Sequence, residues 1–177
     1  MKHVTKLFLM FILLSSLLML SGCFYTLNPI YTDKDVVFDP ALTGDWVQVN
    51  GNRVLAFAQE GGENRYRLTY RDGAATQEYA VHLVELEGRR FLDFYPSPGG
   101  APKSLSPVMP LHAIALVNQT GASLKLSFPN SQWMTRNIAP LGEDIVFTGT
   151  TEQTQQLLRR LLENQGEAFI ALDFTRR

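Results

Sequence analysis

From Gly44 onward, apolar and polar residues alternate in short runs, and clusters of turn residues separate the runs. In residues 65–70, for example, two tyrosines and a leucine alternate with two arginines and a threonine. A period of two is typical of a strand with one buried face. The expected strands are residues 46–49, 53–59, 65–70, 77–86, 90–95, 112–119, 123–128, 144–149 and 168–174.

The turns between these runs indicate how the strands are connected. Asn50-Gly51-Asn52, Asp72-Gly73 and Glu87-Gly88 are hairpin signals, because their residues accept the positive φ that tight turns need. About eight or nine short strands at regular spacing favour an all-β barrel or sandwich over βαβ units. We therefore expect a single up-and-down β-barrel over residues 44–177.

Two segments interrupt the alternation. Residues 96–110 are rich in proline and glycine and have no periodicity, which is typical either of a functional loop such as a lid or of a surface excursion. Residues 129–142 are also expected to be irregular, with Trp133 and Met134 filling an apolar gap.

One helix is predicted late in the chain, at about residues 151–165. Thr150 can cap it, and Gln153 stands in the capping-box position. One apolar stripe, which would pack outside the barrel, is formed by Leu157, Leu158, Leu161 and Leu162. Gly166 is expected to end the helix in the left-handed conformation.

The N-terminal residues have the pattern of a bacterial lipoprotein signal. Lys2 and Lys6 precede an apolar run over residues 7–20, which is short for a membrane span of about 20 residues. Leu20-Ser21-Gly22-Cys23 matches the lipobox, in which the cysteine is acylated and the chain is cut before it. Residues 1–22 are thus expected to be removed. The alternative is an uncleaved anchor beside which Cys23 is a simple thiol.

The predicted lipid anchor indicates where in the cell the protein is located. A cysteine with two or three acyl chains, palmitate among them, would hold the protein on a membrane, because a single chain binds only reversibly. The residue after Cys23 is Phe24 rather than the aspartate that often marks inner-membrane retention, so we expect the periplasmic face of the outer membrane. In an organism with a single membrane it would be the cell membrane. Residues 23–43 form the tether, in which Asp33-Lys34-Asp35 is expected to be a solvated turn.

Composition narrows the chemistry further. Cys23 is the only cysteine, so no disulfide can form within the chain. The formal net charge is −1, and loss of the two signal lysines makes it −3. Because basic residues form no run longer than a pair, nucleic acid is not an expected partner. No cofactor is expected beyond the covalent acyl chains.

Gly44-Asp45-Trp46, at the start of the first strand, resembles the lipocalin superfamily. There, a Gly-x-Trp opens the first strand of an eight-stranded barrel, and a helix packs outside it near the C-terminus. Gly44 and Trp46 would then have structural roles. The chain has no Thr-Asp-Tyr loop and no arginine at the end of the 144–148 strand, where lipocalins place one over the tryptophan. Arg159 or Arg176 could take that place.

The mature chain is also similar to a group of small bacterial lipoproteins for which no activity is known. The matching stretches are residues 31–40 (YTDKDVVFDP), 42–46 (LTGDW), 91–96 (FLDFYP) and 150–152 (TTE). The resemblance implies an envelope location and a barrel shape, and no activity.

Three titratable residues on neighbouring predicted strands are the best candidates for chemistry. His82, Asp93 and His112 could perform acid–base work or hold a metal near a barrel mouth. Each also has a structural explanation: His82 falls on the polar face of its strand, Asp93 can pair with an arginine or backbone N–H groups, and His112 can simply begin a strand. The chain has no His-x-x-x-His, no Gly-x-Ser-x-Gly and no phosphate-binding glycine loop. We expect no enzyme and no metal site.

Aromatic residues are the other candidates. A pocket could be lined by Phe57, Tyr66, Phe91, Phe94 and Trp133, together with Phe169. A barrel of about eight strands is either filled by its side chains or holds one small ligand, and the sequence does not distinguish these. We expect non-catalytic binding of a small apolar or amphipathic molecule, such as a lipid. The alternative is a structural or assembly accessory that binds an envelope protein.

Overall fold

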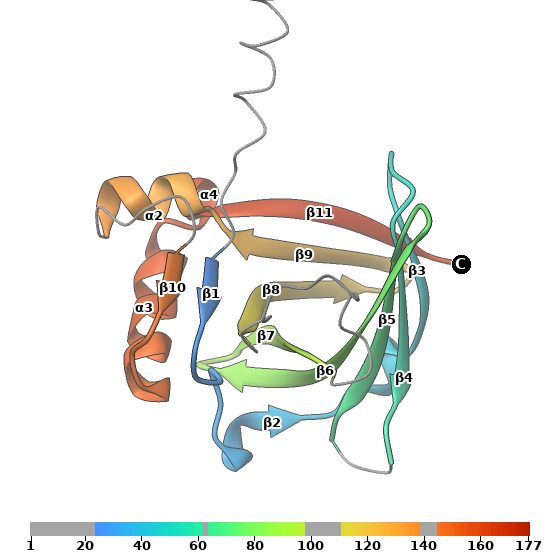
Figure 1. Ribbon diagram of the computed structural model, residues 1–177, viewed down its shortest axis with the longest axis horizontal. Helices are drawn as coiled ribbons and strands as arrows, with labels where there is room; N and C mark the ends of the chain where they lie inside the picture. The colour runs from blue at the N-terminus through green and yellow to red at the C-terminus, as the bar shows by residue number, and fades with distance from the viewer. Residues whose placement is uncertain (1–23, 62–63, 98–110, 139–144) are drawn as a thin grey trace, which may run out of the picture.

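A computed structural model describes residues 24–61, 64–97, 111–138 and 145–177 of the protein. Eight antiparallel strands form a closed barrel in sequence order, and the last strand pairs with the first (Figure 1). These strands are β3 (Gly44–Gln48), β4 (Val54–Gln59), β5 (Tyr66–Asp72), β6 (Ala75–Leu86), β7 (Arg89–Pro96), β8 (His112–Thr120), β9 (Ser123–Pro129) and β11 (Phe169–Arg176). The predicted up-and-down barrel is confirmed.

Three short strands lie outside the barrel circuit: β1 (Phe24–Thr26), β2 (Val36–Val37) and β10 (Ile145–Phe147). β10 pairs in parallel with β1, and β1 pairs antiparallel with the start of β8. The segment 144–149 was expected to be one more strand of the series. It belongs instead to this side arm, and the eighth barrel strand is β11.

Three helices connect β9 to β11: α2 (Ser131–Asn137), α3 (Thr151–Glu163) and α4 (Gln165–Ala168). α3 confirms the predicted outer helix, and Thr150 and Gln153 form its capping box. The expectation of an irregular segment over 129–142 was wrong for α2, which begins because the Asn130 side chain accepts hydrogen bonds from the N–H groups of Gln132 and Trp133. The expected left-handed stop at Gly166 was also wrong, because Asn164 ends α3 and Gly166 lies inside α4.

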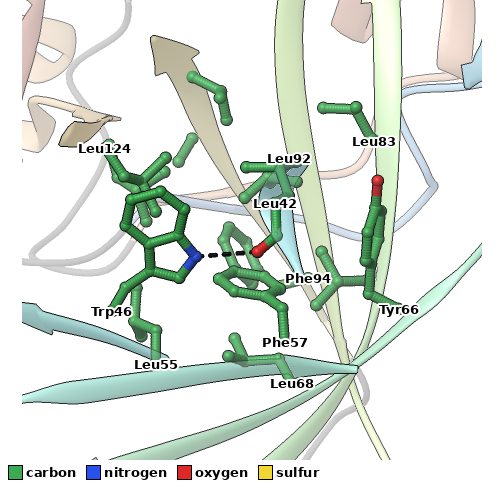
Figure 2. Close-up of a cluster of buried hydrophobic side chains, with 14 of the residues drawn as sticks. Leu42, Trp46, Leu55, Phe57, Tyr66, Leu68, Leu83, Leu92, Phe94 and Leu124 are labelled. Carbon is green, nitrogen blue, oxygen red and sulfur yellow. Dashed lines mark hydrogen bonds between the residues drawn. The ribbon is translucent and has the colours of Figure 1, made fainter. Parts of the chain in front are cut away.

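The apolar residues form two separate cores. One lies in the barrel interior and includes Trp46 and Tyr66 (Figure 2). The other lies between the outer faces of β6–β8 and the helices, and includes Phe91, Ile114 and Leu158. The strands β7 and β8 thus bury both faces, which explains their nearly continuous apolar sequences.

The tether wraps around the barrel before it enters β3. Ile30 is fully buried in the outer core, and Val36 and Val37 pair with Val84 and Leu83 of β6. The solvated turn expected at residues 33–35 is an exposed 3-10 turn, η2 (Asp33–Asp35). A second one, η3 (Pro40–Leu42), then leads into β3.

Candidate ligand cavity

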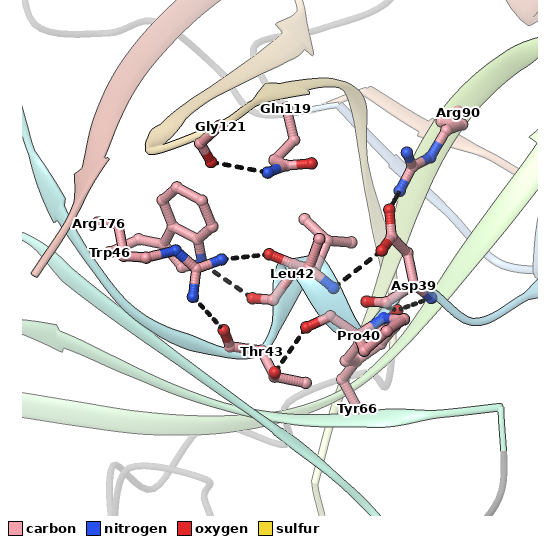
Figure 3. Close-up of polar contacts among 11 residues, drawn as sticks. Asp39, Pro40, Leu42, Thr43, Trp46, Tyr66, Arg90, Gln119, Gly121 and Arg176 are labelled. Carbon is pink, nitrogen blue, oxygen red and sulfur yellow. Dashed lines mark hydrogen bonds and ion pairs between the residues drawn. The ribbon is translucent and has the colours of Figure 1, made fainter.

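One end of the barrel is closed by η3 and the last residues of β11 (Figure 3). Leu42 and Trp46 are fully buried, and the indole N–H of Trp46 donates to the Leu42 carbonyl oxygen over 2.8 Å. Arg176 covers the ring of Trp46 and donates to the carbonyl oxygens of Thr43 and Ala41. Of the two arginines that could cover the tryptophan, Arg176 is the one that does so.

Gly44 is required at this closure. Its φ of +114° is one that residues with a Cβ rarely adopt, and a Cβ there would lie 3.0 Å from Nη1 of Arg176. The positive φ is the main reason for a glycine at this position, and the close approach of the arginine that covers Trp46 adds to it.

A polar network beside η3 holds the tether to the barrel (Figure 3). The Asp39 carboxylate accepts from the Ala41 N–H over 2.8 Å and from Arg90 over 2.7 Å. The Tyr66 hydroxyl donates to the Asp39 carbonyl oxygen over 3.0 Å. Partial burial opposes ionisation of Asp39, but the Ala41 N–H and Arg90 outweigh it and lower the pKa of the carboxyl. Burial raises the pKa of Tyr66.

The opposite half of the barrel contains a partly open cavity of about 810 Å³. This volume lies in the upper part of the range of about 300–1,000 Å³ that is typical of small-ligand sites. Most of the lining is aliphatic or aromatic and comes from the inward faces of β4, β5, β7, β8, β9 and β11. Among the lining side chains are Leu55, Leu68, Phe94, Ala113, Phe128 and Leu172.

A few polar groups lie where the cavity meets the strand ends. Arg53 lines the cavity and donates through Nε to Asp72 over 3.1 Å, and the Tyr70 hydroxyl donates to the same carboxylate. The Tyr79 hydroxyl donates to Gln77 over 2.5 Å. Burial raises the pKa of both tyrosines, so they are neutral near pH 7. An apolar interior with a few polar groups at its edge suits an amphipathic ligand.

The structure separates the aromatic residues that the sequence singled out. Phe94 lines the cavity. Phe57 and Tyr66 point into the barrel but pack together in its filled half, with ring centroids 6.1 Å apart (Figure 2). Phe91, Trp133 and Phe169 belong to the outer core instead. Ligand binding by these residues remains a prediction.

Sequence reasoning missed most of the cavity lining. Leu55, Leu68, Tyr79 and Phe128 all line it. Each lies on the inward face of its strand, and the alternation alone could have placed it there. The missing information was height along the barrel axis, which depends on the register between strands.

His82, Asp93 and His112 do lie together, on the outer face of the barrel under the tether. His112 Nδ1 lies 2.5 Å from the Asp93 carboxylate, which also accepts from the Ile30 N–H over 3.0 Å. Asp93 is fully buried, which explains why both of its oxygens have partners. His82 pairs with Asp93 in register, but its Nδ1 contacts the Tyr31 hydroxyl over 2.9 Å.

This outer cluster holds the tether against the barrel. Burial, and then the charge of Asp93, raises the pKa of Tyr31 to about 12, so its hydroxyl keeps its proton beside His82. Both polar contacts join the tether to barrel strands that lie far from it in the sequence. In the described ranges, no three His, Cys, Asp or Glu side chains group together as a metal site would require.

Two expected sites lie outside the described residues: the acylated Cys23, and most of the proposed lid at 96–110, namely residues 98–110. Within the part of the chain that the structure describes, none of the helices combines the length and the apolar composition that crossing a bilayer needs. No known protein family, curated protein or solved structure matches the chain significantly. The closed eight-stranded barrel is compatible with a lipocalin-like fold.

Proposed function

We propose that the protein is a lipid-anchored bacterial envelope protein that binds a small apolar or amphipathic molecule without catalysis. The main support for the proposal is the cavity of about 810 Å³ in one half of the barrel, opposite the end that η3 covers and where Leu42 and Trp46 are fully buried. A barrel of this size would fill its interior if packing were its only purpose, because cores rarely retain voids larger than a water molecule.

The lining supports an apolar ligand with a polar end. The deep part of the cavity presents Leu68, Phe94 and Leu126, which offer no hydrogen bonds. Arg53 and Tyr70 stand at its edge and share one partner, Asp72. The two terminal nitrogens of Arg53 have no partner among the described residues, so they are available to a polar headgroup.

The lipobox supports the envelope location. Residues 20–23 (LSGC) would place acyl chains on Cys23, directly before β1. The absence of aspartate after Cys23 favours the outer membrane, with the barrel on the periplasmic side.

A cavity-filling substitution tests the proposal. Ala113 points into the cavity, whereas Ala171 is exposed on the outer face of β11. The barrel is titrated with a dansyl-labelled fatty acid, and A113W is compared with its control A171W. We expect A113W to bind at least tenfold more weakly, while A171W binds as the parent does. Equal affinities for the two variants, with unchanged circular dichroism, would contradict binding in the cavity.

A further inference from the structure

One wall of the cavity is formed by β1, next to the cysteine proposed to be acylated. Tyr25 lines the cavity and lies opposite Ala113 of β8, which lines it too. Phe24, the residue after Cys23, also borders the cavity. Because consecutive Cα atoms are about 3.8 Å apart, an acyl group on Cys23 is attached one residue away from the cavity wall.

β1 occupies a place in the wall that β9 leaves. β8 pairs with β9 from Leu116 to its end, whereas its first residues, His112 and Ala113, pair with β1. The last residues of β9 pair with β11, with Phe128 opposite Ile170. β1 therefore extends the wall along the edge of β8 that β9 leaves, and β10 pairs with the other edge of β1 (Figure 1).

The ladder that joins β1 to β8 is short. β1 has 3 residues, whereas β8, the strand it pairs with, has 9. Local opening costs the least free energy where few backbone hydrogen bonds and buried contacts must be broken. Separating β1 from β8 breaks two register pairs and leaves β1 paired with β10, whereas separating β8 from its neighbour β7 breaks five.

A few large apolar side chains are exposed next to β1, β3 and β11. Among the described residues, the large hydrophobic side chains that are exposed are Leu27 (46%), Val49 (46%) and Ile170 (48%). Leu27 follows β1, Val49 follows the last residue of β3, and Ile170 lies near the start of β11 and lines the cavity. Leu27, four residues after the proposed anchor, and Ile170, at the cavity, are exposed apolar groups of the kind that suit contact with a membrane surface.

We infer that the cavity takes up an acyl chain of a membrane lipid directly from the bilayer, and that the chain enters where β1 pairs with β8. This inference rests on the proposed function, and it specifies both the ligand class and the route. A chain that enters beside the anchor passes from one apolar environment to another without exposure to water, so uptake avoids the cost of hydrating it.

A disulfide that fixes β1 tests the route. Tyr25 and Ala113 are register partners, and directly opposite residues of antiparallel strands are close enough for a disulfide. The mature acylated protein with Y25C and A113C is placed in vesicles of phosphatidylethanolamine and phosphatidylglycerol that carry deuterated acyl chains. Native mass spectrometry then follows deuterated lipid on the protein over time, with and without a reductant.

The control is the same type of disulfide in another part of the wall. Lys125 and Asp173 are exposed register partners on β9 and β11, so K125C with D173C joins two strands without touching β1. We expect oxidation to slow lipid uptake at least tenfold in the β1 pair, with recovery on reduction, and to leave uptake in the control pair unchanged.

The outcomes separate this inference from the proposed function. Equal uptake by the oxidised and reduced β1 pair would overturn the route. The parent protein, without added cysteines, is measured alongside: if it takes up no deuterated lipid but binds dansyl-labelled fatty acid from solution, the bilayer source is wrong and the cavity still functions. If it binds neither, both the inference and the proposed function fail.

Discussion

The guanidinium carbon of Arg176 lies 4.4 Å from the ring centroid of Trp46. The two residues come from the last and the first strand of the barrel and are register partners. This contact lies where the first and the last barrel strand pair. It covers the end of the barrel interior beneath η3 (Figure 3). The cavity is therefore confined to the other half.

We expect R176A to lower the free energy of unfolding by about 1–2 kcal/mol, because it removes a cation–π contact and two hydrogen bonds at a partly solvated site. R177A is the matched control: Arg177 is exposed, and its backbone N–H, which the substitution keeps, donates to the Asp45 carbonyl oxygen. Urea unfolding at neutral pH measures both. Equal midpoints for the two variants would show that Arg176 does not hold the barrel closed.

The Asp93–His112 pair is expected to contribute more to stability than the other histidine contact. H112L leaves the fully buried Asp93 carboxylate without its side-chain partner, which should cost about 3–5 kcal/mol. H82L removes a half-buried hydrogen bond and ring contact with the neutral Tyr31 and should cost about 1 kcal/mol. Thermal and urea unfolding measure the difference.

A double variant checks the cause of that loss. If H112L destabilises the protein because it leaves Asp93 without its side-chain partner, the loss of unfolding free energy in H112L with D93L should be clearly less than the sum of the losses in the two single variants. A simple sum would mean that the two side chains contribute independently.

Acid should weaken the closed end of the barrel through Asp39. Its pKa in the folded protein is held below the ordinary value of 3.8, so the folded state favours the ionised carboxylate. The stabilisation is therefore complete above that value and is lost as the pH falls through the folded pKa. We expect the urea midpoint to drop less between pH 7 and pH 3 in D39N than in the parent. An identical drop in both would assign the acid sensitivity to other groups.

The anchor is tested at Cys23. We expect C23S to remain at precursor length and to take up no palmitate analogue, because the acylated thiol is missing. S21A keeps a small residue in the lipobox and should be labelled and processed normally. Continued labelling of C23S would mean that the N-terminus is not a lipoprotein signal.

Local signals in the sequence were sufficient for most of the barrel. The alternation of residues 65–70 and the turns at Gly73 and Gly88, both with positive φ, specify neighbouring antiparallel strands directly. The helix α3 could also be predicted from the sequence, because its capping box and leucine stripe are local features. The role of segment 144–149 was not, because only a distant partner, β1, decides which strand it joins.

The cavity required information that the sequence does not carry locally. Phe57 and Phe94 both face inward, yet only Phe94 lines the cavity, because their heights along the barrel axis follow from strand register and from the position of η3. Phe91 was expected to line the pocket but lies in the outer core, for another reason. Its strand buries both faces, so an outward phenylalanine looks the same in the sequence as an inward one.

Native mass spectrometry of residues 24–177, purified gently from cell envelopes, is the most direct test of whether the cavity binds a ligand. We expect a defined extra mass that survives purification and disappears on extraction with organic solvent, and that mass identifies the class of the ligand. A clean protein mass, with no rise in melting temperature on addition of a panel of lipids, would contradict the claim that the cavity is a binding site.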